Sequence, residues 1–250
     1  MQQLFIADLH LSPDHPRLVR GFLDLLVHYE GRIDQLYIVG DWFEAWLGDD
    51  DHSAWLDSIV KALQQFVAHG TQVFFMHGNR DFALGQQFMQ RFDGQLIRTE
   101  RLTIKNTGLT VMLEHGDALC TDDIAYQRFK KIIRHPLVMT TLLHLPLSLR
   151  RKVAQQARQK SKASHQLKSA DIMDVNEQAV ATVLNQHDVL LHGHTHRPAI
   201  HEYSNGKKRV VLGDWREPDA EINDSTDSAK GSAMIALLNE QGIQLLEWQF

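Results

Sequence analysis

Five apolar segments of this 250-residue chain each end in polar side chains of the kinds that bind metals or phosphate. They are "FIADLHL", "YIVGDW", "FFMHGNRD", "MLEHGD" and "LLHGHTH". Short apolar runs that alternate with amphipathic helices predict an α/β fold, in which the loops after the carboxyl ends of the strands gather at one place. A chain that buries these five runs as strands must therefore bring their polar ends close together.

The expected elements follow this pattern along the chain. "QLFIAD", "QLYIVGD" and "TQVFFMHGN" are predicted strands, with an amphipathic helix around Phe22 and a second helix from an N-cap at Ser53 to Gly70. A further helix through Val175 and Val183 precedes the strand "DVLLHG". Turn residues at 106–108, 205–206 and 242 predict hairpins, which make the sheets mixed.

The polar strand ends supply carboxylate, imidazole and amide donors, which suit Mn, Fe, Zn or Mg. A strand-end aspartate on its own usually caps a turn, whereas five such ends together predict a shared metal site. Glycines at 40, 78 and 193 precede three of the candidates and allow the backbone to bend sharply there. The candidate ligands are Asp8, His10, Asp41, Asn79, His115, His194 and His196.

Charge is distributed unevenly along the chain. Residues 124–170 contain eleven Lys or Arg and no Asp or Glu, which leaves 15 basic and 31 acidic residues elsewhere. Fifteen uncharged residues separate Arg134 from Arg150, and Pro136 and Pro146 interrupt this apolar stretch. It is too short to span a bilayer. We expect one domain over 1–250, with residues 122–170 inserted as a basic, partly apolar helical cap that faces an anionic partner.

The remaining composition indicates a protein of the cytoplasm. The single cysteine, Cys120, cannot form an internal disulfide and fits a reducing compartment. The first residues lack the basic and apolar regions of a secretory signal, and no run reaches about 18 apolar residues. We therefore expect neither a secretory signal nor a membrane-spanning helix.

The order D-X-H, G-D, G-N, H-G-D and G-H-X-H resembles that of the calcineurin-like metallophosphoesterases. The longer stretches "FIADLHLSP", "GDWFEAWLGDD", "HGNRDF", "HGDALCTDD" and "HGHTHRP", with a basic cap before the last, extend the resemblance over nearly the whole chain. They are similar to the branch of that family that cleaves UDP-linked diacylglucosamine in the lipid A biosynthesis of Gram-negative bacteria.

The resemblance implies a fold, a cofactor and a reaction. The fold would have two mixed β-sheets layered between helices, and the cofactor would be two divalent ions, most simply Mn²⁺. Asp8, His10, Asp41 and His196 would hold one ion and Asp41, Asn79, His115 and His194 the other, with Asp41 bridging. Water would attack the α-phosphorus of UDP-2,3-diacylglucosamine, giving UMP and 2,3-diacylglucosamine 1-phosphate, which is lipid X.

Further roles are expected in catalysis and in substrate binding. Arg80 would donate a charge-assisted fork to the pyrophosphate beside Asn79, and these two residues are the catalytic candidates. Asp81 is expected to cap or orient their loop, and Trp42, Phe43 and Trp46 either line an acyl pocket or belong to the core. Cys120 is not needed as a nucleophile. The substrate-binding candidates are Asn79, Arg80, Asp123, Tyr126, Ser161, His165, Lys168 and His194.

The expected partners follow from the cap. Its apolar run suits two acyl chains and its Lys and Arg suit anionic head groups. Together with the lipid substrate that the resemblance implies, this composition leads us to expect peripheral association with the cytoplasmic face of the inner membrane. No obligate protein partner is expected. A nuclease on the same fold is the nearest alternative, but Tyr126 and Phe129 are the only aromatic residues that the cap offers for stacking on bases.

Two alternatives from other classes make different predictions. A scaffold that has lost its metal ligands conflicts with the complete donor set. A histidine pH sensor would work without metal, so chelation followed by an assay separates it from an enzyme. A protein phosphatase is disfavoured because "GDWFEAW" lacks D-R-G and "GNRD" differs from G-N-H-E.

Overall fold

The computed structural model describes the chain except for residues 105–107, 168–173 and 219–229 and the side chains of 160–167. Its strands form two sheets. The larger sheet has the order β10 (Trp215–Arg216), β11 (Ser232–Asn239), β1 (Gln3–Ile6), β2 (Gln35–Val39), β3 (Gln72–Met76) and β4 (Gln95–Ile97), and β12 (Gly242–Gln249) pairs with β11. The smaller sheet has the order β5 (Glu100–Thr103), β6 (Thr110–Leu113), β7 (Val189–His192), β9 (Lys208–Val211) and β8 (Ala199–Glu202).

Both sheets are mixed: the larger one is antiparallel on the side of β11, and the smaller one is antiparallel at both edges. Strands β1 to β4 are parallel to one another, and β6, β7 and β9 are parallel in the second sheet. The segments "QLFI" and "VLLH" are buried along their whole length, because helices or the other sheet cover both faces. The parallel arrangement makes the carboxyl ends of these strands point the same way within each sheet.

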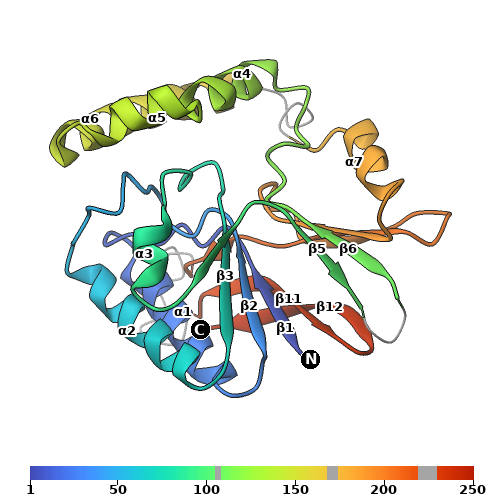
Figure 1. Cartoon of the computed structure of the whole chain (residues 1–250). Coiled ribbons are helices and arrows are strands. Elements are labelled where there is room, and N and C mark those ends of the chain that lie inside the picture. The colour runs from blue at the N-terminus through green and yellow to red at the C-terminus, as the bar shows by residue number, and fades with distance from the viewer. Residues whose placement is uncertain (105–107, 168–173, 219–229) are drawn as a thin grey trace.

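The two sheets pack against each other and helices cover their outer faces (Figure 1). Helices α1 (Pro16–Tyr29), α2 (Trp55–Ala68) and α3 (Gln86–Gln90) lie over the larger sheet, and α7 (Glu177–Leu184) lies over the smaller one. Leu18, Phe22 and Leu25 form the buried stripe of α1, as their helical spacing requires. The predicted fold class, with mixed sheets layered between helices, is confirmed.

Three local expectations need comment. Ser53 does not cap α2, because its Oγ donates to Asp51 Oδ1 at 2.5 Å and the helix begins after Ala54. Val175 precedes α7, and Asn176 caps that helix by accepting from two backbone amides. Most of the turn expected at 106–108 lies outside the described residues, although β5 and β6 pair antiparallel as a hairpin requires. The strand pairs around 205–206 and 242 are antiparallel as expected.

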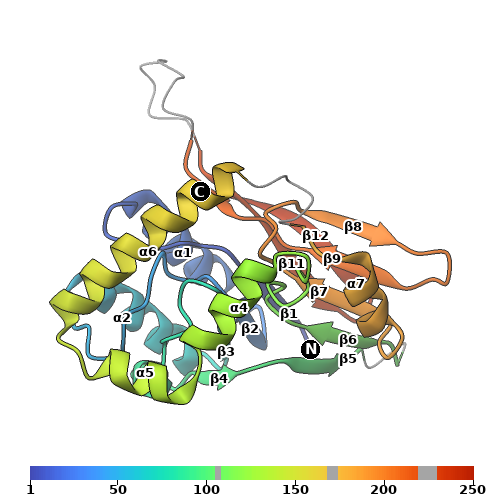
Figure 2. The same cartoon turned by 90° about the horizontal axis from the view of Figure 1, so that it is seen from above.

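Helices α4 (Ile124–Ile133), α5 (Pro136–Leu143) and α6 (Leu147–Leu167) lie together across one end of the molecule (Figures 1 and 2). They occupy the end at which β1, β2 and β3 finish. No described helix is long and apolar enough to cross a bilayer. We call α4, α5 and α6 the cap.

The positive charge of the cap faces carboxylates of the body. Arg150, Arg151 and Arg158 pair with Asp50, Asp51 and Glu44 of the loop after β2, and Lys130 and Arg134 pair with Asp117. Arg150 is almost completely buried and also donates to the carbonyl oxygens of Leu47 and Leu145. Part of the charge asymmetry that predicts an anionic partner is therefore neutralised within the chain.

Candidate metal centre

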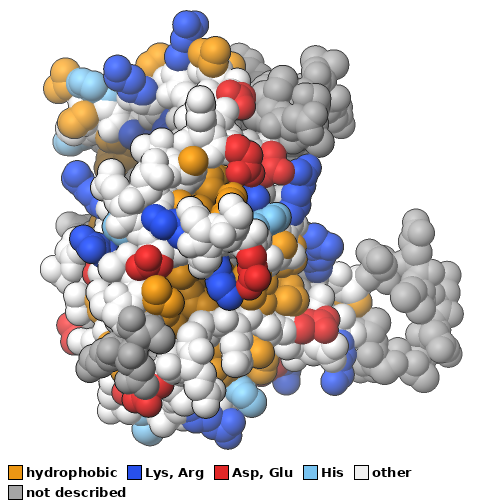
Figure 3. Space-filling model, turned by 90° about the vertical axis from the view of Figure 1, so that its right-hand side faces the viewer, with side chains coloured by type: hydrophobic (Ala, Val, Ile, Leu, Met, Phe, Trp, Pro, Cys, Tyr) orange, Lys and Arg blue, Asp and Glu red, His pale blue; other side chains and the backbone are white. Residues whose placement is uncertain are grey.

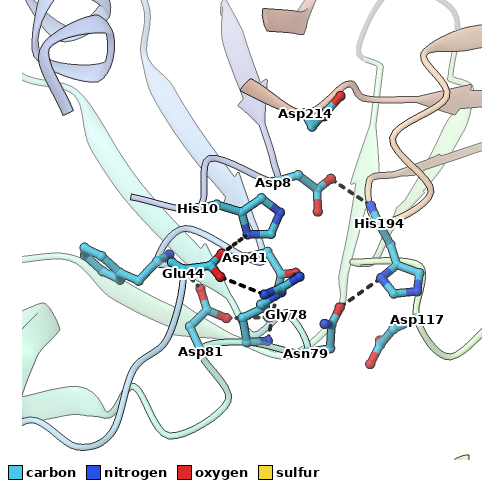
Figure 4. Close-up of polar contacts among 12 residues, drawn as sticks. Asp8, His10, Asp41, Glu44, Gly78, Asn79, Asp81, Asp117, His194 and Asp214 are labelled. Atoms are coloured by element: carbon cyan, nitrogen blue, oxygen red, sulfur yellow. Dashed lines mark hydrogen bonds and ion pairs between the residues drawn. The ribbon is translucent and has the colours of Figure 1, made fainter. Parts of the chain in front are cut away.

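The five polar strand ends converge where the two sheets meet (Figure 4). The loops after β1, β2 and β3 of the larger sheet and after β6 and β7 of the smaller sheet all end at this point, because both sets of parallel strands direct their carboxyl ends toward it. They bring together Asp8, His10, Asp41, Asn79, His115, His194 and His196.

Most of these residues have an uncommon backbone conformation. Asp8, His10, Asp41, His194 and His196 have φ between 51° and 71°, in the left-handed region that side chains with a Cβ seldom adopt. Each such residue costs stability, and residues of this kind cluster where function constrains the chain. The strain here coincides with the candidate ligands.

Two glycines are required by close approach to the carboxylates. A Cβ at Gly78 would lie 2.1 Å from Asp41 Oδ1, and a Cβ at Gly193 would lie 2.5 Å from Asp8 Oδ2. A side chain at either position would displace the carboxylate from the centre.

The donor atoms form two adjacent groups. In the first group, Asp8, His10 and His196 meet, with the Nε2 atoms of the two histidines 3.5 Å apart and His196 Nε2 3.5 Å from Asp8 Oδ1. In the second group, Asn79 Oδ1 lies 3.1 Å from His115 Nε2 and 2.9 Å from His194 Nδ1.

Carboxylates lie between these two groups. Asp41 Oδ1 is 3.8 Å from His115 Nε2, and Asp8 comes within ligand range both of His10 and His196 and of Asp41 and His115. The two groups are thus close enough to hold two ions that share a carboxylate.

Burial and the neighbouring carboxylates shift the pKa values of the candidate ligands. Burial raises the pKa of Asp41 to about 6, with the neighbouring Asp8 adding to this effect. Burial lowers the pKa of His10 to about 4 and that of His194 to about 3, so both rings are neutral near pH 7. Burial alone would also lower the pKa of His196, but Asp214 and Asp8 outweigh it and raise that pKa to about 10.

The side chains present fit divalent metal ions. Asp8 Oδ1 is buried and accepts no hydrogen bond from the described residues, and a cation would satisfy it. The set consists of carboxylate and amide oxygens and imidazole nitrogens, which suit Mn, Fe, Zn or Mg. These residues could therefore hold two divalent ions side by side.

The residues next to the candidate ligands have separate tasks. Asp81 is completely buried and accepts from the backbone amides of Gly78, Trp42 and Phe43, so it orients the loop as expected. Arg80 is partly exposed, and its Nη1 donates to Glu44 Oε1 at 3.0 Å.

Two carboxylates at the centre were not anticipated. Asp214 Oδ2 lies 3.4 Å from His196 Nδ1, and Glu44 Oε2 lies 3.5 Å from His10 Nδ1. Asp214 had a usable signal, because "VVLGDW" repeats the pattern of a glycine and an aspartate after a buried strand that marks Asp41 in "YIVGDW". Glu44 had none, since nothing in the spacing of "GDWFEAW" separates it from a surface glutamate.

Five of the substrate candidates lie outside the metal centre. Tyr126 donates to Asp117 Oδ2 at 2.5 Å, and its ring stacks 6.4 Å from that of His194. Asp123 caps α4 by accepting from Tyr126 N, so it has a structural task beside any contact with substrate. The side chains of Ser161 and His165 and all of Lys168 lie outside the described residues.

The remaining candidates are part of the body. Trp42, Phe43 and Trp46 are buried against Phe88, so of the two roles considered for them the structure gives them that of core residues. His192 is completely buried in β7, and His201 is exposed in β8. Cys120 is buried, and its thiol donates to the carbonyl oxygen of Gly116 at 3.9 Å.

The fold and this donor set identify the class of protein. Residues 1–198 match the model of the family described as calcineurin-like phosphoesterase, and the chain belongs to that family. Hydrolysis of phosphoric esters with divalent metal ions, the chemistry of this family, suits the oxygen and nitrogen donors at the strand ends.

Within this family, the chain is similar to relatives that it matches over most of their length. The UDP-2,3-diacylglucosamine hydrolase of Pseudomonas fluorescens (strain SBW25) is 42% identical over 252 residues, which cover 99% of this chain and 95% of the relative. The UDP-2,3-diacylglucosamine hydrolase of Tolumonas auensis is 46% identical over 221 residues, which cover 86% of this chain and 89% of the relative. The enzyme of the same name from Salmonella typhimurium is 43% identical, covering 92% and 98%.

Proposed function

We propose that this protein hydrolyses the pyrophosphate bond of UDP-2,3-diacylglucosamine, giving UMP and 2,3-diacylglucosamine 1-phosphate in lipid A biosynthesis. The observation that carries the proposal is the convergence of seven donor side chains from five strand ends in a chain whose relatives of that name match it over 86% or more of its length. This function would place the protein in the cytoplasm, at the inner membrane of a Gram-negative bacterium.

The metal ligands are proposed on the geometry of the two groups. Asp8, His10, Asp41 and His196 would hold one ion and Asp41, Asn79, His115 and His194 the other, and Asp8 lies close to the donor atoms of both groups. Two divalent ions bound there, which we take to be Mn²⁺, would polarise the phosphoryl oxygens and lower the pKa of a water toward neutrality.

The rest of the reaction depends on residues of the chain. The water oxygen attacks the α-phosphorus, and the bond from that phosphorus to the oxygen bridging the β-phosphate breaks, so the water oxygen remains in UMP. The departing group is a phosphate monoester and needs no strong general acid. Arg80, which is held at the edge of the centre by Glu44, donates to the pyrophosphate as negative charge builds up.

The first experiment measures UMP release from UDP-2,3-diacylglucosamine by the purified protein, in EDTA and with added Mn²⁺. We expect no release in EDTA and restored release with Mn²⁺, because both phosphoryl polarisation and the nucleophile depend on divalent ions. Metal-dependent hydrolysis of a generic phosphodiester without UMP release would contradict the lipid substrate and retain the metal centre. UMP release at full rate in EDTA would contradict both.

The cap supports the lipid part of the proposal. It carries exposed apolar side chains, among them Ile132 at 64% and Leu137 at 73% exposure. Hydrophobic and basic side chains lie together at the top of the face in Figure 3, the end of the molecule that the cap covers in Figure 1. Apolar and basic side chains side by side suit acyl chains and anionic head groups at a membrane surface.

Replacing both Ile132 and Leu137 by serine is expected to lower kcat/KM for the lipid substrate in mixed micelles about thirtyfold, because partial burial of each of the two side chains in lipid contributes about 1 kcal/mol. Hydrolysis of a soluble phosphodiester should be unchanged. Val27→Ser removes an equally exposed residue, at 72%, from the body and should change neither rate. Equal losses on both substrates for the cap variant would contradict a lipid-binding cap.

A further inference from the structure

Glu44 is the one described carboxylate that contacts the metal centre, the residue proposed to hold phosphate, and the cap. It lies in the loop after β2, three residues beyond Asp41, and its backbone amide donates to Leu11 O at 3.0 Å in the loop that carries His10. Its side chain is only partly exposed. The loops of β1 and β2 thus hold Glu44 in place between the centre and the cap.

The contact with His10 concerns the ring atom that faces away from the centre. His10 Nε2 points toward His196 Nε2, 3.5 Å away, so Nε2 is the atom available to a metal. His10 Nδ1 is buried without a hydrogen-bond partner among the described residues, and Glu44 Oε2 lies 3.5 Å from it. A carboxylate at Nδ1 favours the tautomer with its proton on Nδ1, which leaves Nε2 free to bind a metal.

The other carboxylate oxygen of Glu44, Oε1, contacts two arginines from different parts of the chain. Arg80 Nη1 donates to Glu44 Oε1 at 3.0 Å, and Arg158 Nη2 of α6 lies 2.8 Å from the same atom. Arg158 also donates to the backbone carbonyl of Glu44. The cap therefore holds both the main chain and the side chain of this residue.

The neighbouring ion pair between Arg151 and Asp51 provides a comparison for the pair between Arg158 and Glu44. Arg151, also on α6, pairs with Asp51 at 3.1 Å, and Asp51 in turn accepts from Ser53. Both pairs join α6 to the loop after β2. Of the two acidic partners, only Glu44 goes on to contact His10 and Arg80.

We propose that Glu44 is a positioning residue that couples the cap to the metal centre: it orients His10 for metal binding and Arg80 for phosphate, and Arg158 of the cap holds it in that position. The proposal rests on the metal centre and the role of Arg80 proposed above. It predicts that a change in the cap at Arg158 alters metal affinity, although Arg158 touches none of the proposed ligands in the described contacts.

Glu44→Gln tests the first part, because an amide cannot serve all three neighbours. If its NH₂ faces His10, it competes with the Nδ1 proton and favours the tautomer that blocks Nε2; if it faces the arginines, donor meets donor. We expect Glu44→Gln to weaken Mn²⁺ binding about 10- to 100-fold by calorimetry. The environment of bound Mn²⁺, followed by electron paramagnetic resonance, should change as well.

Arg158→Gln and Arg151→Gln form a matched pair that tests the coupling. We expect Arg158→Gln to weaken Mn²⁺ binding about fivefold and Arg151→Gln to leave it within twofold of wild type. In the double variant with Glu44→Gln, Arg158→Gln should add no further loss, because it acts through Glu44. Melting temperatures of the metal-free variants establish that each one folds.

The outcomes separate this inference from the proposed function. Wild-type Mn²⁺ affinity in Glu44→Gln would overturn the positioning of His10, and equal effects of Arg158→Gln and Arg151→Gln would overturn the coupling to the cap. Both are measured without substrate, so failure of UMP release by the wild type would overturn the lipid substrate alone. A wild type that binds no Mn²⁺ would overturn the metal centre itself.

Discussion

Asp41→Asn is expected to lower kcat/KM by roughly a thousandfold or more, which corresponds to about 4 kcal/mol of transition-state stabilisation. The substitution keeps the shape of a side chain that is 3% exposed, and an amide oxygen can still accept from Arg80 N, which lies 2.8 Å from Asp41 Oδ1. It removes the negative charge that lies between the two donor groups. Steady-state rates of UMP release at saturating Mn²⁺ measure the loss.

The same variant should be no less stable than the wild type when both are metal-free. Burial raises the pKa of Asp41 from 3.8 to about 6 in the folded protein, so the metal-free wild type loses stability as the pH rises between these values. Asparagine carries no such charge beside Asp8 and Asp81. Mn²⁺ should raise the melting temperature of the wild type more than that of the variant.

Thermal melts at pH 7.5 in EDTA and in Mn²⁺ measure this difference between Asp41→Asn and the wild type. A variant that keeps more than a tenth of the wild-type rate would contradict the role of Asp41. A variant that melts well below the wild type in EDTA would show that the lost rate reflects misfolding, and His115→Ala would then serve as the second test of the centre.

Arg80→Ala is expected to lower kcat/KM about 100- to 1,000-fold, the range found when one donor to a developing negative charge is removed. The Arg80 side chain is 35% exposed at the rim, with Nη1 donating to Glu44 Oε1 and Nε 3.9 Å from Asp41 Oδ2. Arg80→Lys should recover only a small part of the rate, because an ammonium group cannot donate a planar fork to phosphate while it pairs with Glu44.

Arg91→Ala is the control for Arg80→Ala, because Arg91 also pairs with a carboxylate, that of Asp57, but in a different part of the body. Arg91→Ala should leave UMP release within twofold of the wild type. If Arg80→Lys turned over substrate at the wild-type rate, a positive charge alone would suffice at this position. That result would contradict the proposal that the guanidinium donates two hydrogen bonds to the pyrophosphate. If Arg80→Ala behaved like Arg91→Ala, Arg80 would be only an ion-pair partner of Glu44.

Local sequence patterns were sufficient for the layered fold and for the position of the centre. A buried run such as "YIVGDW" contains both the strand and the polar residue that follows it, so its signal is complete within six residues. Within each sheet the parallel strands direct such ends to one edge. The packing of the two sheets then brings Asp8 and Asp41 of the larger sheet to His194 of the smaller one, although they are far apart in the chain. Asp214 belongs to this class, since "VVLGDW" has the same pattern as "YIVGDW".

The tertiary structure alone decided which residues surround the centre and what the charge of the cap does. The pairing of Glu44 with Arg158 joins residues 114 positions apart, and that of Arg150 with Asp50 joins residues 100 positions apart. Neither pair has a local pattern, because each depends on how α6 packs over the loop after β2. Composition records that basic residues gather at 124–170 but carries no information on which carboxylate each one meets, since charges pair by distance in space and not along the chain.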